Sequence, residues 1–248
     1  MASIDLTADD TVIEDETTTA SASAALTAPA ASSLAVSAPL TGGVVGDFSS
    51  KDIKVPRLNV VQKMSDDLIE LGHSPGDVAY NREVKYIPFG KSGLVTVLGL
   101  VRQYQQKIPY GTKDVIPDIV DTEEEVYAKG GTLAYDGVNV YQPIAHITCL
   151  VEATDAVTED HEAYFPFENG DKLYALAKWT VASTAYKDVA VPLISAAKLY
   201  LRDGLHKVKW KLSVRKKTNG QNSWFAPSLV QAGKNSPEFI EFAAGFLG

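Results

Sequence analysis

Cysteine is almost absent from the chain, since Cys149 is the only one among its 248 residues. A single cysteine excludes a disulfide within the chain, and this fits a reducing compartment. Long apolar runs are absent as well: the longest candidate, residues 93–101, has the length of a strand rather than the ~20 residues of a membrane span. The N-terminus lacks the basic segment of a secretory signal. The sequence therefore predicts a cytoplasmic protein that makes no membrane contact.

Basic residues are missing from the first part of the chain. Seven acidic residues and no Lys or Arg precede Lys51, so the first 50 residues hold −7 of the net charge of −8. Residues 198–217 show the opposite bias, because Asp203 is the one acid among eight Lys and Arg residues. A local cationic segment in a chain that is otherwise near neutral is typical of proteins that bind polyanions.

Large apolar residues are scarce in residues 1–46, which consist mainly of Ala, Ser, Thr and Pro. Such a segment cannot bury enough surface to offset the entropy lost on ordering, so we expect a disordered acidic tail over 1–46 and a single domain over 47–248. The acidic residues of the tail are candidates for contact with replication or recombination proteins. The alternative is that the tail only aids solubility.

The clearest pattern lies in residues 206–227. Apolar Val208, Trp210, Leu212 and Val214 alternate with polar and cationic residues, which predicts a β-strand with one core face and one cationic face. Asn219-Gly220 favours a two-residue turn, and the chain then returns through Trp224. With a loop of two or four residues, Trp224 lies on the cationic face and Phe225 in the core. The predicted product is a basic β-hairpin.

Weaker patterns cover the remainder of the domain. Strands are expected at 55–62, 78–84 and 93–104, the last with a bulge or bend at Gly99, and a hairpin is expected over 133–152 around Asp136-Gly137. Residues 114–125 are expected to form a loop. Helices are expected at 169–180, 192–202 and 237–246, with Trp179 packed on the first. We therefore expect a mainly β (α+β) fold, either an OB-like, partly open barrel or a small sandwich, with two or three attached helices.

No sequence motif predicts catalysis or a cofactor. Gly90-Lys91-Ser92 lacks the first glycine of a phosphate-binding loop, and His146 and Cys149 would face opposite sides of a strand. Asp77, Glu83 and Lys85 follow the order of metal-dependent nuclease residues, but we expect all three on one strand, where the acids would not converge. The sequence therefore favours a protein that is not an enzyme and has no metal or cofactor, with a metal-dependent nuclease as the weakest alternative.

Two regions resemble a known family. The sequences VPRLNVVQKMSDD and SPGDVAYNREV near the start, and KWKLSVRKKTNGQNSWFAPSLV near the end, are similar to single-stranded DNA-binding proteins of tailed bacteriophages, over about residues 48–247. The resemblance implies an OB-type barrel and a role in phage DNA replication or recombination, in the host cytoplasm. Members of this family often end in an acidic tail that recruits partners. This chain ends in FAAGFLG and has its acids at the N-terminus, so recruitment by a C-terminal tail is in doubt.

Together, hairpin and resemblance predict sequence-tolerant binding of single-stranded DNA, with cations on phosphates and an indole stacked on a base. About five neutralised phosphates would give a log–log salt slope near −3.5. The alternative is a structural or interaction protein, such as a virion or assembly component, whose lysines only protect an edge strand. The sequence specifies neither an oligomeric state nor a preference for DNA over RNA. The candidate nucleic-acid-binding residues are Lys207, Lys209, Lys211, Arg215, Lys216, Lys217 and Trp224.

Overall fold

The computed structural model describes residues 55–109, 112, 115–135 and 137–247. The predicted tail, residues 1–46, lies outside the described residues, as does Asp136 of the predicted turn. The described chain forms, in order, β1 (Leu58–Val60), α1 (Asp66–Ile69), β2 (Val78–Tyr80), β3 (Val84–Ile87), β4 (Ser92–Gln106), β5 (Ile119–Val120), α2 (Glu123–Ala128), β6 (Tyr141–Glu152), η1 (Glu159–Tyr164), β7 (Phe167–Asn169), β8 (Lys172–Ala182), α3 (Ser183–Ala185), η2 (Tyr186–Ala190), α4 (Val191–Leu199), η3 (Leu205–Lys207), β9 (Val208–Asn219), β10 (Asn222–Lys234) and α5 (Pro237–Ala244).

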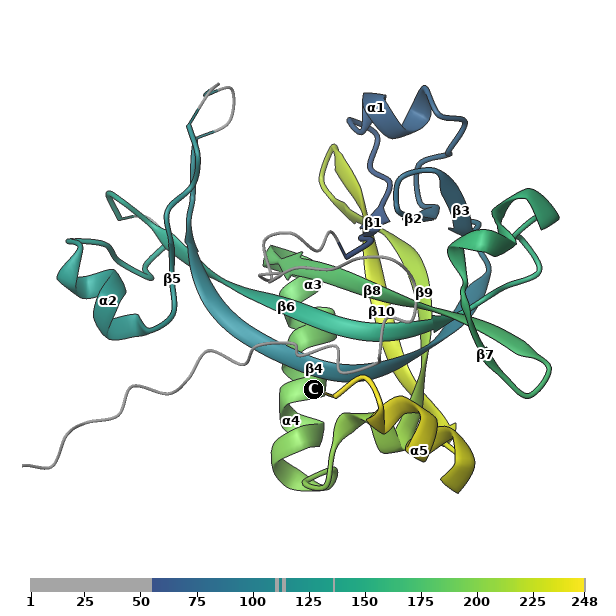
Figure 1. Cartoon of the computed structure of the whole chain (residues 1–248). Coiled ribbons are helices and arrows are strands. Elements are labelled where there is room, and N and C mark those ends of the chain that lie inside the picture. Colours follow the sequence, from purple (N-terminus) through teal and green to yellow (C-terminus); the bar gives the residue numbers. More distant parts are fainter. Residues whose placement is uncertain (1–54, 110–111, 113–114, 136, 248) are drawn as a thin grey trace, which may run out of the picture. The chain divides into compact units, whose positions relative to one another are not determined.

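The strands form two antiparallel sheets (Figure 1). The smaller sheet has the order β1-β2-β3, and the larger has the order β10-β9-β4-β6-β8-β7, with β5 paired to one end of β4. The predicted mainly β fold with attached helices is therefore confirmed. The two sheets do not close into a barrel, because β10 and β7 end the larger sheet without pairing to each other.

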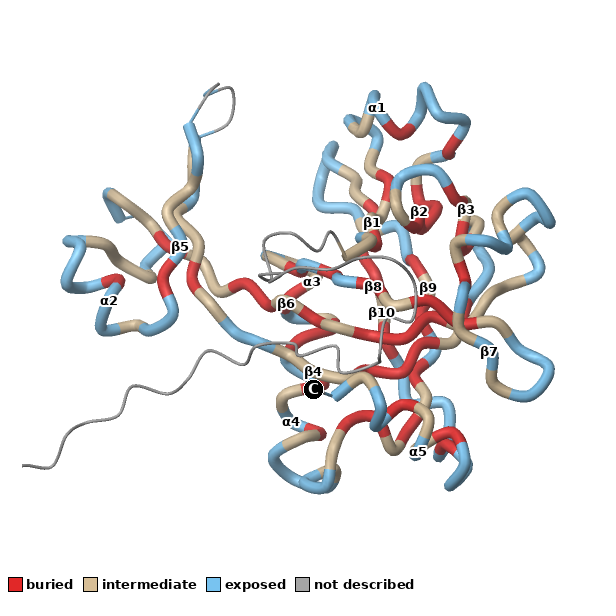
Figure 2. Tube along the Cα trace, viewed as in Figure 1, coloured by how far each residue is buried: buried red, intermediate tan, exposed pale blue. Residues whose placement is uncertain are grey.

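One face of the larger sheet packs against the smaller sheet and a helical segment. Side chains such as Ile147 and Trp210 from the larger sheet, Tyr86 from β3 and Leu193 from α4 share one buried cluster. Figure 2 shows the buried residues running along the strands of the larger sheet. Burial on this scale contributes about 25 cal/mol for each Å² of apolar surface removed from water. The cluster therefore joins sequence-distant elements into one core.

The opposite face of the larger sheet is partly covered by α5. Phe239 of α5 packs against Leu150 of β6 and Tyr174 of β8, with the Tyr174 and Phe239 ring centroids 5.1 Å apart. The predicted helix over 237–246 is confirmed, and it begins after Ser236, whose Oγ accepts a hydrogen bond from the Phe239 N–H (3.2 Å). None of the helices in the described part of the chain is long and apolar enough to cross a membrane.

The predicted helix over 169–180 is wrong. These residues form the end of β7 and most of β8, which pairs with β6 over nine residue pairs. Leu173, Leu176 and Ala177 match a helical spacing, but Ala177, Trp179 and Val181 also alternate at period 2, and they point into the core. Tertiary pairing selects the second of the two patterns. Trp179 is therefore buried in a strand and not on a helix.

The predicted hairpin over 133–152 is also wrong, because only its second half is a strand. From Ile144 onward β6 is flanked by β4 on one side and by β8 on the other, so neither side is free for residues 133–138. The predicted loop over 114–125 is wrong at its C-terminal end, where β5 and the start of α2 lie. Thr122 and Glu125 form a Thr-x-x-Glu capping pattern there, and the Thr122 side chain accepts a hydrogen bond from the Glu125 N–H.

Two other predictions are confirmed. The predicted helix over 192–202 corresponds to α4, with Pro192 in its first turn, although it ends at Leu199. It continues a helical run that starts at Ser183 and includes η2, a single π-helical turn. The pairing of β4 with β6 shifts between Val97 and Gly99, which is the expected bulge.

Candidate nucleic-acid interface

The β9–β10 hairpin forms with a loop one residue later than expected. Asn219 pairs with Asn222, so the loop residues are Gly220 and Gln221, and Gly220 adopts a φ of 59°. A glycine at the first loop position suits a type II′ turn, for which positive φ carries no steric cost. Trp224 consequently opposes Lys217 rather than Arg215. A loop that begins one residue later shifts the cross-strand pairing by two residues. Trp224 therefore keeps its predicted place on the face of Arg215 and Lys217.

Three of the candidate cations are exposed at the hairpin: Lys211, Arg215 and Lys216. None of them lies within ion-pair distance of an acidic side chain among the residues that the structure describes. By strand alternation Lys211 and Arg215 share one face, and Lys216 projects from the other. On the side of Lys216, the Nζ of Lys63 donates to Ser223 Oγ at 2.7 Å, which brings a further cation to the hairpin.

The other three cations have neighbours that reduce their availability. Lys207 lies at the end of η3 and pairs with Asp203, with Nζ and Oδ2 3.4 Å apart. Lys217 pairs with Asp188 of η2, and both side chains are partly buried. Lys209 is half-buried and lines a cavity that Glu152 also lines. The six predicted phosphate ligands therefore do not form one continuous surface.

The positions of the lysines in the sheet bear on the alternative that they only protect an edge strand. Lys209 and Lys211 belong to β9, which lies between β10 and β4, and Lys211 pairs with both Val230 and Leu94. The edge strand is β10, and its sequence contains a single cation, Lys234. Lysines that protect an edge are expected on the edge strand itself. Edge protection thus does not account for Lys211, whereas Arg215, Lys216 and Lys217 lie beyond Ser213, the last β9 residue that pairs with β4.

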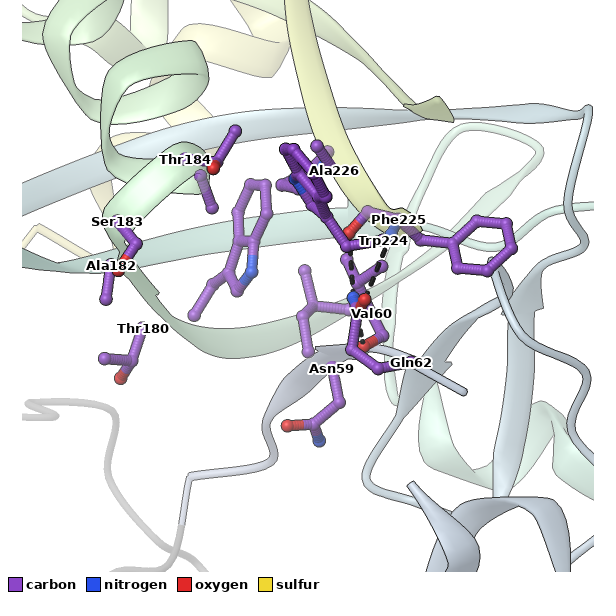
Figure 3. Close-up of a pocket in the computed structure, with 14 residues that line it drawn as sticks. Asn59, Val60, Gln62, Thr180, Ala182, Ser183, Thr184, Trp224, Phe225 and Ala226 are labelled. Carbon is purple, nitrogen blue, oxygen red and sulfur yellow. Dashed lines mark hydrogen bonds between the residues drawn. The ribbon is translucent and has the colours of Figure 1, made fainter. Parts of the chain in front are cut away.

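Trp224 lines a cavity and does not form a flat exposed platform. The cavity has a volume of about 340 Å³ and lies where β1, the end of β8, α3 and β10 meet. Figure 3 shows the indole of Trp224 extending from β10 toward the segment that carries Thr184. The side chains that line this cavity include Leu58, Asn59, Val60, Gln62, Trp179, Thr180, Thr184, Trp224 and Phe225.

A side-chain amide holds the β10 wall of this cavity. The Gln62 Nε2 donates to the Phe225 carbonyl oxygen (2.8 Å), and the Gln62 Oε1 accepts from the Phe225 N–H (3.0 Å) (Figure 3). The amide thus satisfies two backbone groups that an edge strand otherwise leaves unpaired. Trp224 is therefore attached to a fixed stretch of backbone.

The indole nitrogen of Trp224 is an unsatisfied donor. The Nε1–H of Trp224 is buried and has no hydrogen-bond acceptor within the described residues. The Nε1–H of Trp210 in the core lacks an acceptor as well, so the missing partner does not by itself mark a ligand position. The site combines aromatic walls with a rim of neutral polar side chains.

The candidate catalytic groups do not form a site. Asp77, which directly precedes β2, and Lys85 of β3 are not on one strand as predicted, and Asp77 Oδ2 and Lys85 Nζ are 3.4 Å apart. Both oxygens of Asp77 accept backbone N–H groups, from Ser74 and Phe89, whereas Glu83 accepts the hydroxyl of Tyr164. The two acids are therefore engaged in separate contacts, and they do not converge on a shared ion.

The remaining motifs also lack their chemical context. His146 is half-buried on one side of β6, and Cys149 is buried on the other, where burial raises the thiol pKa to about 12. Across the described ranges, no three His, Cys, Asp or Glu side chains gather closely enough to hold a metal ion. Gly90-Lys91-Ser92 leads into strand β4, whereas a phosphate-binding loop leads into a helix.

Sequence reasoning missed most of the cavity. Asn59 and Gln62 come from a segment about 120 residues before the one that holds Trp179, Thr180 and Thr184, and no short motif links the two. Trp179 was assigned only a packing role. The basic and aromatic pair Lys178-Trp179, which repeats the pattern of Lys209-Trp210, is the one local signal that this strand offers.

Comparison of the chain with protein-family models, with curated proteins and with solved structures gives no match.

Proposed function

We propose that this chain binds single-stranded DNA with little sequence preference, through the β9–β10 hairpin. The observation that carries the proposal is the combination of three exposed cations without acidic partners in the described ranges, Lys211, Arg215 and Lys216, with an indole on the same hairpin. Ammonium and guanidinium groups neutralise phosphates, and an indole stacks on an unpaired base. The role in phage replication or recombination comes from the sequence resemblance.

The same proposal includes an OB-type relationship and a partner contact. The resemblance to the phage proteins implies an OB-type domain, and the acidic residues before Lys51 are candidates for contact with replication or recombination proteins. Both belong to the proposal together with DNA binding. Pull-down of host or phage replication proteins by the full chain, compared with a chain in which the acids of residues 1–16 are changed to amides, tests the partner contact.

The decisive experiment is fluorescence anisotropy with a labelled oligo-dT, titrated against salt. Single-stranded DNA gives a log–log slope of about −0.7 for each phosphate contacted, so three hairpin cations account for about −2. We expect the triple variant Lys211→Gln, Arg215→Gln, Lys216→Gln to lose that part of the slope. A triple variant of Lys91, Lys107 and Lys198, which are exposed, lie outside the hairpin and have no ion pair within the described ranges, removes the same charge and serves as the control.

Two results would count against the proposal. The absence of oligonucleotide binding by the unmodified chain at low salt would remove its basis, and the structural or assembly alternative would then stand. Equal losses in the hairpin variant and the control variant would show that only net charge matters, and that the hairpin is not the binding element.

A further inference from the structure

Two further cations, Arg57 and Lys178, are adjacent in sequence to residues that line the cavity beside Trp224, although neither lines it. Arg57 precedes Leu58 and Lys178 precedes Trp179, and both of the following residues line the cavity. The backbones of the two segments are joined. The Lys178 N–H donates to the Pro56 carbonyl oxygen at 2.8 Å, and Arg57 and Lys178 form an isolated parallel β-bridge. Arg57 and Lys178 are both exposed.

Strand alternation places these cations on the same side as the polar rim of the cavity. Residues two apart on a strand share a face, so Arg57 lies on the side of Asn59, and Lys178 lies on the side of Thr180. Thr180 Oγ1 lies 2.9 Å from Nδ1 of His146. Burial, followed by repulsion from Lys178 and Arg57, lowers the pKa of His146, which agrees with both cations lying near this rim.

Neither cation has an acidic partner in the described ranges. Arg57 lines a different hollow, and the acids of that hollow are engaged elsewhere. Asp67 pairs with Arg82, with 2.8 Å between Nη2 and Oδ2, and Glu83 accepts the Tyr164 hydroxyl. Arg57 and Lys178 therefore remain available to an anionic ligand.

We propose that this cavity receives one unpaired base of a bound DNA strand, and that Arg57 and Lys178 contact the phosphates on the side away from the hairpin. The inference deepens the proposed function and rests on it. Trp224 and Trp179 supply aromatic walls on which a base can stack. A volume of about 340 Å³ lies at the lower end of the range of small-ligand sites.

The rim composition agrees with a sequence-tolerant base site. Asn59, Gln62, Thr180 and Thr184 are neutral, and Asn, Gln and Thr side chains carry both donor and acceptor capacity. Such a rim does not exclude any one of the four bases on charge. Stacking depends on the face of the ring, which every base provides. The cavity would thus hold a base while the cations on both sides hold its phosphates.

The first test removes the second cation pair. We expect Arg57→Gln, Lys178→Gln to reduce the magnitude of the log–log salt slope for oligo-dT by about 1.4, because two phosphate contacts are lost. Together with the three hairpin cations this gives a total slope near −3.5. The double variant Lys198→Gln, Lys234→Gln removes two exposed cations on α4 and β10 and is the control.

The second test fills the cavity. Ala185 of α3 lines it, so Ala185→Leu occupies the space of a base. We compare oligo-dT with an abasic oligomer of the same length, which keeps the phosphates and lacks the bases. Ala185→Leu is expected to reduce the preference for oligo-dT by about tenfold, within the range for one stacked base. Ala197→Leu, on a half-buried helical alanine of α4 against the same core, is the control, and melting temperatures verify that both variants fold.

The outcomes separate the two proposals. If the unmodified chain does not bind oligo-dT, the proposed function fails, and the cavity inference fails with it. If the chain binds and the hairpin variant weakens binding, but either cavity variant matches its control, the cavity inference alone is overturned. Changes in both cavity variants, with their controls unaffected, support it.

Discussion

Trp224 contributes an aromatic ring to the hairpin, but it does so as one wall of a cavity. Its ring is half-buried, its backbone neighbour Phe225 is fixed by Gln62, and its Nε1–H has no acceptor in the described ranges. A ring held in this way loses little entropy when a base stacks on it. The position of Trp224 is therefore suited to binding, although its exposure is lower than the hairpin sequence alone would indicate.

Replacing Trp224 distinguishes stacking from packing. We expect Trp224→Ala to weaken oligo-dT binding by about 1–3 kcal/mol, or roughly 5- to 150-fold, without changing the salt slope. Trp224→Phe should retain most of the affinity, since a smaller ring can still stack. Trp210→Phe is the matched control, because Trp210 is buried on the core face of the same hairpin. Comparable losses from Trp210→Phe would show that binding responds to hairpin stability and not to stacking.

Among the elements, strands with one clear periodicity could be predicted from the sequence. β9 alternates strictly, and its core face, including Trp210, was predicted correctly. β8 was mistaken for a helix because its small apolar residues satisfy spacings of both 2 and 3.6, and only pairing with β6 decides between them. The hairpin predicted over 133–152 failed for the same reason. Its first strand has no place because β4 and β8 occupy both sides of β6, and only the assembled sheet shows this.

The residues of the candidate site could also be predicted only where a local sequence pattern reveals them. Lys211, Arg215 and Lys216 were found because a local alternation exposes them. Ion pairs to Lys207 and Lys217 were not foreseen. Lys207 has its partner, Asp203, only four residues away, but Lys217 has its partner, Asp188, on a separate element, η2. Of the cavity, only Trp224 was among the predicted site residues, because the other walls come from distant segments of the chain.

The ion pair between Asp188 of η2 and Lys217 of the hairpin predicts a variant that binds DNA more tightly. We expect Asp188→Asn to free Lys217 and to remove a negative charge beside Trp224, which Lys217 opposes across the hairpin. The magnitude of the salt slope should then grow by up to about 0.7, with higher affinity at low salt. Stability should fall by no more than about 1 kcal/mol, as is usual for partly exposed pairs.

Anisotropy titrations of Asp188→Asn against oligo-dT, beside Asp160→Asn, provide the measurement. Asp160 lies in η1 and is exposed, so its replacement changes net charge equally without freeing Lys217. An equal gain in both variants would trace the effect to overall charge. A loss of affinity in Asp188→Asn would mean that the pair positions the hairpin for binding.

At the scale of the whole molecule, one core joins the two sheets and the helical segment, and Cys149 lies within it. Burial raises the pKa of its thiol from 9.0 to about 12, so the folded chain keeps the thiol neutral where an unfolded chain ionises it. A raised pKa on an acidic group stabilises the fold fully below pH 9, and this stabilisation is lost as pH rises from 9 toward 12. Burial, with a smaller effect of Cys149, also raises the pKa of Tyr80 to about 12, which adds to the loss above pH 10.

We therefore expect the unfolding free energy to decline above pH 9, with the thiol contributing about 1.4 kcal/mol of the decline between pH 8 and pH 10. Urea unfolding of the unmodified chain and of Cys149→Ala at both pH values measures this contribution together with the smaller effect of the thiol on Tyr80, because the surface groups are common to both. Cys149→Ala should be less stable at pH 8, since a buried side chain is shortened, but its stability should fall less by pH 10. An identical decline in the two chains would mean that the thiol ionises as readily in the folded state as in the unfolded one, and that the core around β6 admits water.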